Sequence, residues 1–290
     1  MKQIALLGAA SVLPRVAAAL AHWADRQGEV VLVDADVEAR GLASLLGGEQ
    51  REEGLAAAAN EADVDPVACT ACGDCAQACR FGAVAMDADD APARILRWAC
   101  CGCGACVSAC PEGAIRLIPA PLGRWHRQIT PLGLLFSASL EPGREHLGEV
   151  LTVVRQQAAR AAVEGCADWL LIAGPVGSGR AAIAAYAGAD LLLTVVEPGP
   201  LGKRSLEHAL ALAERVGAPL AVVVAGADAH EQDAASLGIE PDALLGQVTV
   251  DPMPDQQARS LEQDPLIQAL APVWEACRAR LQQPFVAWDG

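Results

Sequence analysis

The sequence predicts an α/β protein with a mostly parallel, doubly wound sheet that is interrupted by a cysteine-rich insertion. Short apolar runs alternate with helical patterns at the start of the chain and again from about residue 130 onward. This alternation indicates parallel strands covered by helices on both faces. Between these two parts, residues 62–119 hold nine of the eleven cysteines and have short turns in place of long apolar runs.

The elements of the sheet can be placed in order. Up to about residue 60 the chain alternates strand, helix, strand and helix, with a strand at residues 3–8, a helix at 12–27 and a strand at VVLVDAD. Further strands are predicted at LGLLFSAS, DWLLIAG, DLLLTVVEP, PLAVVVAG and GQVTVD, with helices between them.

Two strands are too few to stand alone, so residues 1–61 and 120–290 are predicted to form one domain around an inserted domain at residues 62–119. The three prolines of PAPLGRWHRQITP indicate a linker back into the sheet.

Composition excludes several classes of function. The net charge of −15 argues against nucleic acid or an anionic membrane as a partner. No uninterrupted apolar run reaches 18 residues, so we expect no membrane span. The N-terminal segment has the basic start and short apolar run of a signal peptide, but Arg15 interrupts that run, and a strand followed by a helix fits better. The predicted location is the cytoplasm.

The cysteines form two runs with the same spacing. CTACGDCAQAC and CCGCGACVSACP both contain C-x2-C-x2-C-x3-C, the pattern of bacterial ferredoxins with two [4Fe–4S] clusters. In that pattern three close thiolates hold one cluster and the fourth cysteine of the run reaches the other cluster. The predicted ligands of the first cluster are Cys69, Cys72, Cys75 and Cys110, and those of the second are Cys79, Cys100, Cys103 and Cys106.

The flanking residues FGAV and EGAI repeat in the same way, and the insertion closely resembles the ferredoxin domain with two [4Fe–4S] clusters. Arg80 departs from that resemblance, because the family usually has proline there, and a positive charge beside a cluster raises its potential. Zinc sites and disulfides fit the tight triplets less well. Cys101 is interpreted as a bystander thiol, and Cys166 and Cys277 as buried core residues.

The rest of the chain resembles the MinD/ParA-type P-loop ATPases that carry an inserted ferredoxin domain. The resemblance rests on VVLVDADVEA, on DWLLIAGPVGSG and on GADLLLTVVEPGPLGKRSLEHALALAERVG. It implies a P-loop-NTPase-like fold in which GPVGSG is the second switch. It places the phosphate loop after the first strand.

That phosphate loop is degenerate. The family reads roughly G-K-G-G-x-G-K-[ST], whereas this chain reads GAASVLPRV. Only Gly8 remains of the glycines, Arg15 is the only nearby cation, and no lysine occurs between Lys2 and Lys203. A phosphate loop needs a lysine to reach the β- and γ-phosphates and a hydroxyl to hold Mg²⁺.

Other positions of the nucleotide site are altered too. Ala173, just before Gly174, stands where the family has an aspartate, and AGAD at residues 225–228 replaces the base-recognition motif. Asp34 and Asp36 remain, with helix capping as their expected role. We therefore expect neither ATP hydrolysis nor tight binding of ATP and Mg²⁺. An adapted anion site stays open as an alternative, at Gly174, Gly177, Gly179 and Arg180.

Together these motifs predict an iron–sulfur electron-transfer protein on a pseudo-ATPase scaffold. Its expected partner is a redox protein, either an intact paralogous ATPase or a larger oxidoreductase complex. Three alternatives stay open. The chain could be an active ATPase that couples nucleotide turnover to low-potential electron transfer, with Arg15 or Arg180 replacing the lysine. It could also be a cluster carrier or maturation factor, or a subunit whose clusters sense redox state.

Overall fold

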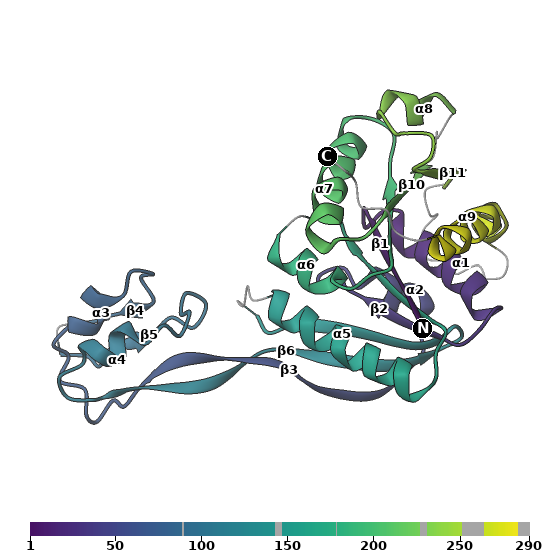
Figure 1. Cartoon of the computed structure of the whole chain (residues 1–290). Coiled ribbons are helices and arrows are strands. Elements are labelled where there is room, and N and C mark those ends of the chain that lie inside the picture. Colours follow the sequence, from purple (N-terminus) through teal and green to yellow (C-terminus); the bar gives the residue numbers. More distant parts are fainter. Residues whose placement is uncertain (89, 143–146, 178, 227–230, 251–263, 284–290) are drawn as a thin grey trace.

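The computed structural model describes residues 1–88, 90–142, 147–177, 179–226, 231–250 and 264–283 (Figure 1). A nine-stranded sheet organises the chain, in the order β11-β10-β9-β1-β8-β2-β7-β6-β3. Its strands are β1 (Lys2–Gly8), β2 (Val30–Asp34), β3 (Glu49–Val64), β6 (Ile115–Thr130), β7 (Gly133–Leu140), β8 (Trp169–Pro175), β9 (Leu191–Val196), β10 (Leu220–Gly226) and β11 (Leu244–Thr249). Neighbours from β11 to β7 pair in parallel, and β6 and β3 add an antiparallel edge.

Helices cover both faces of the sheet, as the alternating pattern predicted. Along β1, Ile4 and Leu6 belong to one core and Ala5 and Leu7 to the other. The first core includes α1 (Leu13–Asp25), α2 (Gly41–Leu46) and α9 (Pro265–Gln282). The second core includes α5 (Leu147–Glu164), α6 (Arg180–Tyr186) and α7 (Pro200–Val216), while α8 (Glu231–Ser236) packs beside β10. Within the described residues, no helix combines the length and the apolar character needed to cross a bilayer.

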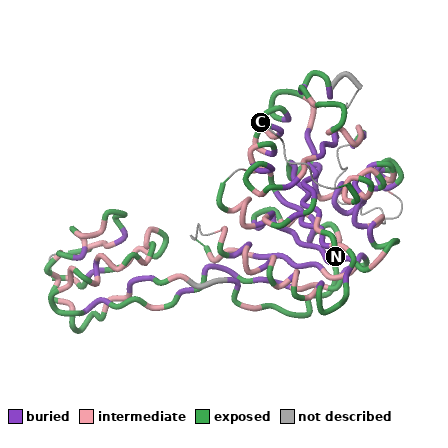
Figure 2. Tube along the Cα trace, in the orientation of Figure 1, coloured by how far each residue is buried: buried purple, intermediate pink, exposed green. Residues whose placement is uncertain are grey.

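The antiparallel edge extends into an arm. β3 and β6 have 16 residues each, but β7 pairs with β6 only from Gly123 to Thr130. Outward from Gly123, β3 and β6 therefore pair only with each other, over roughly 25 Å at 3.3 Å per residue. Figure 1 shows this ribbon leaving the sheet and carrying a small domain at its tip. Figure 2 shows buried residues concentrated in the sheet domain, with mostly intermediate and exposed residues at the tip.

Two expectations about this region were wrong. PAPLGRWHRQITP was predicted to be a linker, but it lies in β6 and pairs with β3. The second predicted helix ends early, because α2 stops at Leu46 and the chain continues as β3. In both segments the partner strand, distant in sequence, supplies the hydrogen bonds that decide the structure.

The tip domain is built from short elements. They are α3 (Asp74–Ala78), β4 (Val84–Ala85), β5 (Arg94–Ile95) and α4 (Ala105–Ala109). β4 and β5 form a separate two-stranded sheet. Ala62 and Ile115, at the outer ends of the ribbon, belong to the same apolar core as Cys75 and Cys106. The arm therefore ends inside the tip domain.

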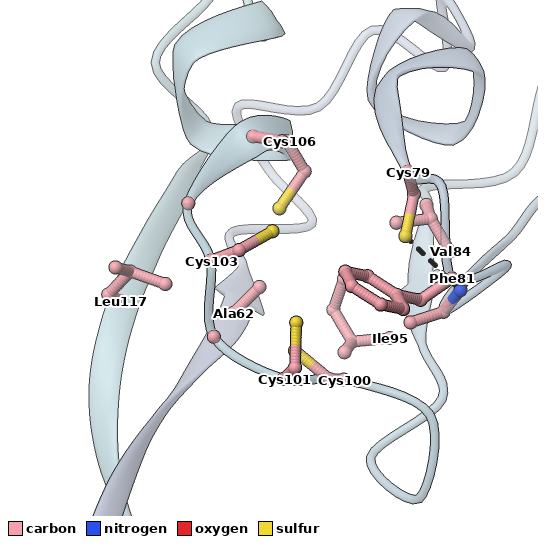
Figure 3. Close-up of a pocket in the computed structure, with 14 residues that line it drawn as sticks. Ala62, Cys79, Phe81, Val84, Ile95, Cys100, Cys101, Cys103, Cys106 and Leu117 are labelled. Atoms are coloured by element: carbon pink, nitrogen blue, oxygen red, sulfur yellow. Dashed lines mark hydrogen bonds between the residues drawn. The ribbon is translucent and has the colours of Figure 1, made fainter.

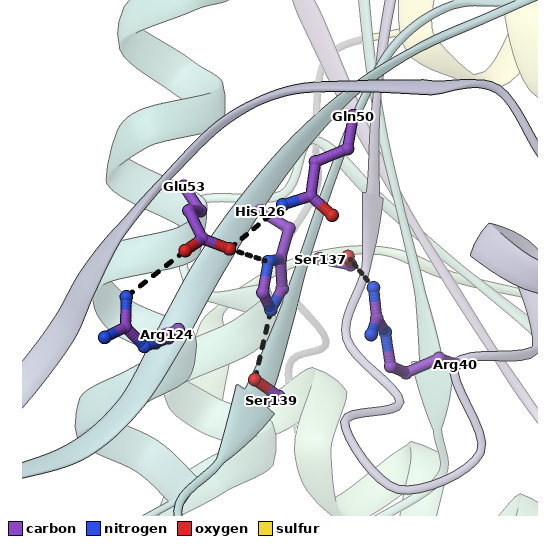
Figure 4. Close-up of polar contacts among 7 residues, drawn as sticks. All are labelled: Arg40, Gln50, Glu53, Arg124, His126, Ser137 and Ser139. Atoms are coloured by element: carbon purple, nitrogen blue, oxygen red, sulfur yellow. Dashed lines mark hydrogen bonds and ion pairs between the residues drawn. The ribbon is translucent and has the colours of Figure 1, made fainter.

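A polar network fastens the arm to the sheet (Figure 4). His126 of β6 pairs across the ladder with Glu53 of β3 and Ser137 of β7. Its Nε2 lies 3.0 Å from Ser139 Oγ, and its Nδ1 lies 3.6 Å from Glu53 Oε2, too long for a hydrogen bond. Glu53 also contacts Arg124 at 3.4 Å. The network joins the three antiparallel strands where the arm begins.

We predict that His126 makes the protein sensitive to acid. Burial lowers the pKa of His126, and the charge of Arg40 lowers it further. The unfolded chain takes up this proton near the ordinary histidine pKa of about 6.5, while the folded protein takes it up only at lower pH. Stability from this group is therefore present above about pH 6.5 and is lost as the pH falls below it.

The test is urea unfolding at pH 5.5 and 7.5 of the wild type and of His126→Gln. The wild type should lose more stability on acidification, by at most about 1.4 kcal/mol per pH unit. His208→Gln, on α7 outside the network, controls for the loss of a histidine. Equal pH slopes for the wild type and His126→Gln would contradict the prediction.

Candidate metal centre

Four cysteines surround a first hollow in the tip domain. Cys69, Cys72, Cys75 and Cys110 line it together with the apolar side chains of Met86, Ala93 and Ile115. Cys75 lies in α3, and Cys110 follows the last residue of α4. The hollow thus gathers three cysteines of the first run and the last cysteine of the second run, which is the set predicted from the spacing.

A second hollow, of similar size, holds the complementary set (Figure 3). Cys79, Cys100, Cys103 and Cys106 line it, and so does Cys101. The space between the protein atoms, open solvent included, is about 340 Å³ here and 310 Å³ at the first hollow. Ala62 and Leu117 of the arm also line this hollow. Both hollows therefore border the arm, the first through Ile115 and the second through Ala62 and Leu117.

The two cysteine loops have the same backbone course. In each loop, the residues on either side of the second cysteine have positive φ. In the first loop they are Ala71, at 56°, and Gly73, at 83°. In the second loop they are Gly102, at 68°, and Gly104, at 78°. Gly73 is the N-cap residue of the short helix α3, and Gly104 is the N-cap residue of the short helix α4. Left-handed residues curl the chain tightly, so that closely spaced side chains can face one point. The sequence repeat is thus a structural repeat.

Burial and charge act differently on the thiols. Burial raises the pKa of the Cys75 and Cys106 thiols. The pKa of Cys103 is lowered, first by the backbone N–H of Ala105, with a contribution from the charge of Arg80. A cysteine binds metal as a thiolate, so metal binding at the buried thiols of Cys75 and Cys106 would release protons.

The residues fit iron–sulfur clusters. Each hollow offers the four predicted thiols beside apolar side chains, and cysteine thiolates are the usual ligands of [4Fe–4S] clusters. Across the described residues, no three His, Cys, Asp or Glu side chains converge on a point that would hold a single metal ion. The sulfurs instead stand around a hollow, which suits a cluster of several irons.

We predict that Arg80 raises the potential of the second cluster. Arg80 follows Cys79, stacks on Phe81 at 5.9 Å and acts electrostatically on Cys103. A positive charge stabilises the reduced, more negative cluster. Arg80→Ala should lower one of two midpoint potentials, on the order of 50 mV, in an EPR-monitored redox titration. Arg116→Ala, in the arm and paired with Asp63 at 3.0 Å, is the control. An unchanged pair of potentials in Arg80→Ala would refute this role.

The turn after β1, where the phosphate loop was expected, is closed on itself. The carbonyl of Ala9 accepts hydrogen bonds from the N–H groups of Val12 and Leu13, at 3.1 and 2.9 Å. Pro14 has no N–H to offer. A Cβ on Gly8 would lie 3.0 Å from the carbonyl oxygen of Val195, so close packing against β9 explains this glycine.

Arg15 is committed to another partner. Its guanidinium forms two-pronged hydrogen bonds with the carboxylate of Asp264, at 3.0 to 3.1 Å, and both side chains are mostly buried. Asp264 is the N-cap residue of α9 and also accepts from the N–H of Leu266. The cation nearest to the turn thus ties α1 to α9.

The acidic residues at the end of β2 and just after it accept hydrogen bonds from the following turn and helix. Asp34 accepts from the N–H groups of Ala43 in α2 and of Asp36, at 2.9 and 3.1 Å. Asp36 accepts from the N–H of Ala39 at 2.9 Å. The capping role predicted from sequence is confirmed for Asp34. Burial raises the pKa of Asp34 to about 6, although its backbone hydrogen bonds act in the opposite direction.

Tyr186, which no sequence motif indicates, completes this region. Ala173 pairs with Asp34 across the β8–β2 ladder, and a Cβ on Gly174 would lie 2.6 Å from the Tyr186 hydroxyl. That hydroxyl donates to the carbonyl of Pro175 at 3.2 Å. Burial raises the Tyr186 pKa, and Asp36 and Asp34 raise it further. The residue before Gly179 in the glycine-rich turn, and residues 227–228 of AGAD, lie outside the described part of the chain.

We predict that Arg15 stabilises the fold through Asp264. Arg15→Ala leaves a largely buried carboxylate without its charged partner and should lower the free energy of unfolding by about 2 kcal/mol. The measurement is denaturant unfolding. The control is Arg278→Ala, whose more exposed ion pair with Glu275 at 2.8 Å should contribute less than about 1 kcal/mol. Equal losses in the two variants would contradict a special role for the Arg15 pair.

The remaining cysteines differ from one another. Cys277 is buried in α9, as predicted. The prediction that Cys166 is a core residue was wrong, because it is exposed and has a φ of 54° in the turn after α5. Cys101 lies at the second hollow and is exposed.

Fold and site together define a class: an iron–sulfur protein whose two-site domain is carried by a doubly wound α/β domain. Residues 68–115 match the family model of the 4Fe-4S dicluster domain. The chain therefore carries a 4Fe–4S dicluster domain, and the resemblance stated from the cysteine runs is confirmed. A comparison with curated proteins gives no match.

Solved structures identify the fold of the whole chain. A chain of the MinC:MinD cell division protein complex of Aquifex aeolicus superposes with a TM-score of 0.51 at 16% identity, covering 100% of both chains. The ATP complex of a McdA variant from Cyanothece gives 0.50 at 15%, covering 99% of this chain and 98% of that one. A ParA family ATPase from Chlorobium tepidum gives 0.47 at 12%, covering 97% and 96%. The first two confirm the MinD/ParA-type fold.

Proposed function

We propose that this protein transfers electrons through two [4Fe–4S] clusters at the end of its arm. The observation that carries the proposal is the division of eight cysteines between two hollows, in the sets that the two-cluster spacing requires. Cys69, Cys72, Cys75 and Cys110 would hold one cluster, and Cys79, Cys100, Cys103 and Cys106 the other. When bound, the clusters supply one-electron carriers. Both hollows share one apolar core, so the clusters would be neighbours between which an electron can pass.

The arm supports a role in delivering electrons to another protein. The free part of the ribbon places the tip roughly 25 Å beyond the sheet, so a partner can approach the clusters without contacting the scaffold (Figure 1). The partner in this proposal is a redox protein, either an intact paralogous ATPase or a larger oxidoreductase complex. Because its cluster thiols must stay reduced, the protein would work in the cytoplasm.

The scaffold in this proposal neither binds ATP with Mg²⁺ tightly nor hydrolyses it. The N–H groups of Val12 and Leu13 are already used within the turn after β1, and Arg15 is held by Asp264. Ser11, the hydroxyl nearest to that turn, contacts Glu197 at 3.2 Å. A phosphate loop needs free amides, a reachable cation and a hydroxyl for Mg²⁺. Here the amides of Val12 and Leu13, the guanidinium of Arg15 and the hydroxyl of Ser11 each have a protein partner.

The experiment that tests the function uses protein purified under anaerobic conditions. Two clusters predict about eight irons and about eight acid-labile sulfides per chain. Dithionite should then generate EPR signals of reduced [4Fe–4S] clusters, and the reduced protein should pass electrons to cytochrome c in a stopped-flow assay. Stoichiometric zinc in place of iron, or clusters that dithionite cannot reduce, would overturn the proposal.

Nucleotide binding is tested on the same preparation by calorimetry. Titration with Mg²⁺-ATP and Mg²⁺-ADP up to millimolar concentration should give no binding heat. Micromolar affinity for either nucleotide would overturn the pseudo-ATPase hypothesis and favour ATP-coupled electron transfer. Arg15→Ala and Arg180→Ala would then show which cation replaces the missing lysine.

A further inference from the structure

The second hollow has one thiol more than the first. Cys100 and Cys101 both line it, whereas at the corresponding place in the first run Cys69 is followed by Thr70. The surroundings are otherwise a structural repeat, with matching left-handed residues in both loops. The extra thiol is therefore a difference in possible metal ligands between two loops of the same backbone course.

Cys101 lines the second hollow beside the predicted ligands Cys100 and Cys103. It lies close enough to Cys103 and Cys100 to interact electrostatically with both. Figure 3 shows its sulfur beside the Cys100 sulfur, on the loop that passes below Cys103. Cys100 packs against the apolar core of the tip domain, while Cys101 is exposed. One thiol thus approaches the hollow from the core side and the other from the solvent side.

We propose that Cys101 is an exchangeable fifth ligand of the second cluster, able to replace Cys100 on the same iron. This inference rests on the function proposed above. In the exchange, the Cys101 thiol gives up its proton as its sulfur binds iron. The Cys100 sulfur takes up a proton as its bond to that iron breaks. No electron changes hands, so the exchange needs no oxidant or reductant.

The loop confines this exchange to its first two residues. Gly102 follows with a φ of 68°, and a Cβ there would lie 2.0 Å from the carbonyl oxygen of Asn60 in the arm. This close contact holds the turn against the arm, so Cys103 and Cys106 keep their places. A shift of Cys100 and Cys101 alone would move the site of attachment from the core side to the solvent side of the cluster.

The test compares iron content and EPR spectra of four variants purified anaerobically as full-length protein. Cys100→Ala should keep about eight irons per chain, because Cys101 takes over. Cys100→Ala/Cys101→Thr, which gives the second run the threonine of the first, should fall to about four. Cys69→Ala, with no spare thiol beside it, should also fall to about four. Cys101→Thr alone should keep about eight.

Two results would overturn the inference. One is a loss of iron in Cys100→Ala as large as the loss in Cys100→Ala/Cys101→Thr. The other is full retention of iron in both of these variants. If Cys100→Ala does not fold, maleimide labelling of the wild-type holoprotein decides. The exposed Cys166 is labelled in either case. An exchanging pair adds both Cys100 and Cys101 to the labelled residues, whereas a bystander Cys101 is labelled without Cys100. Failure of the proposed function itself is distinct, because the wild type would then lack iron.

Discussion

The pairing of β3 with β6 is the constraint on which the architecture depends. These two strands belong to the sheet at one end and to the tip domain at the other, so their register sets the position of the metal centre relative to the scaffold. A slip of one residue would turn every side chain to the opposite face. At the tip, Arg97 contacts the buried carboxylate of Glu61 at 3.2 Å, and Gly102 packs on Asn60. At the base, the contacts of His126 with Ser139 and Glu53 also hold the register of these strands.

Charged groups at the carboxyl end of the sheet have partners within the chain. In a P-loop nucleotide site, phosphate and Mg²⁺ balance such groups. Here they are balanced within the chain: Arg15 by Asp264, and Asp34 by backbone N–H groups. Tyr186 fills the space beside Gly174 and keeps its hydroxyl bonded to a carbonyl. Because polar groups that are buried must be paired, these contacts stabilise the fold itself.

The sequence predicted those features that depend on local spacing. The cysteine sets follow from gaps of two and three residues, and the core strands from apolar runs buried on both faces. β3 was missed because its many alanines and glutamates favour a helix when taken alone. β6 was missed because of Pro119 and Pro121, which a strand tolerates where one edge is free. The contact of Arg15 with Asp264 joins opposite ends of the sequence, and no local pattern indicates it.

The two halves of the tip domain share a fold but not an electrostatic environment. The repeat places Arg80 and Phe81 where the other half has Pro111 and Glu112. Glu112 lines the first hollow, while Arg80 acts on a cysteine of the second. In the proposed electron-transfer role, negative charge near one cluster and positive charge near the other would separate their potentials, and the second cluster would be reduced more readily. An electron that enters at the first cluster would then move toward the second, the cluster that the arm residues Ala62 and Leu117 help to enclose. The opposite charges of Arg80 and Glu112 would thus set the direction of electron transfer between the two halves of the repeat.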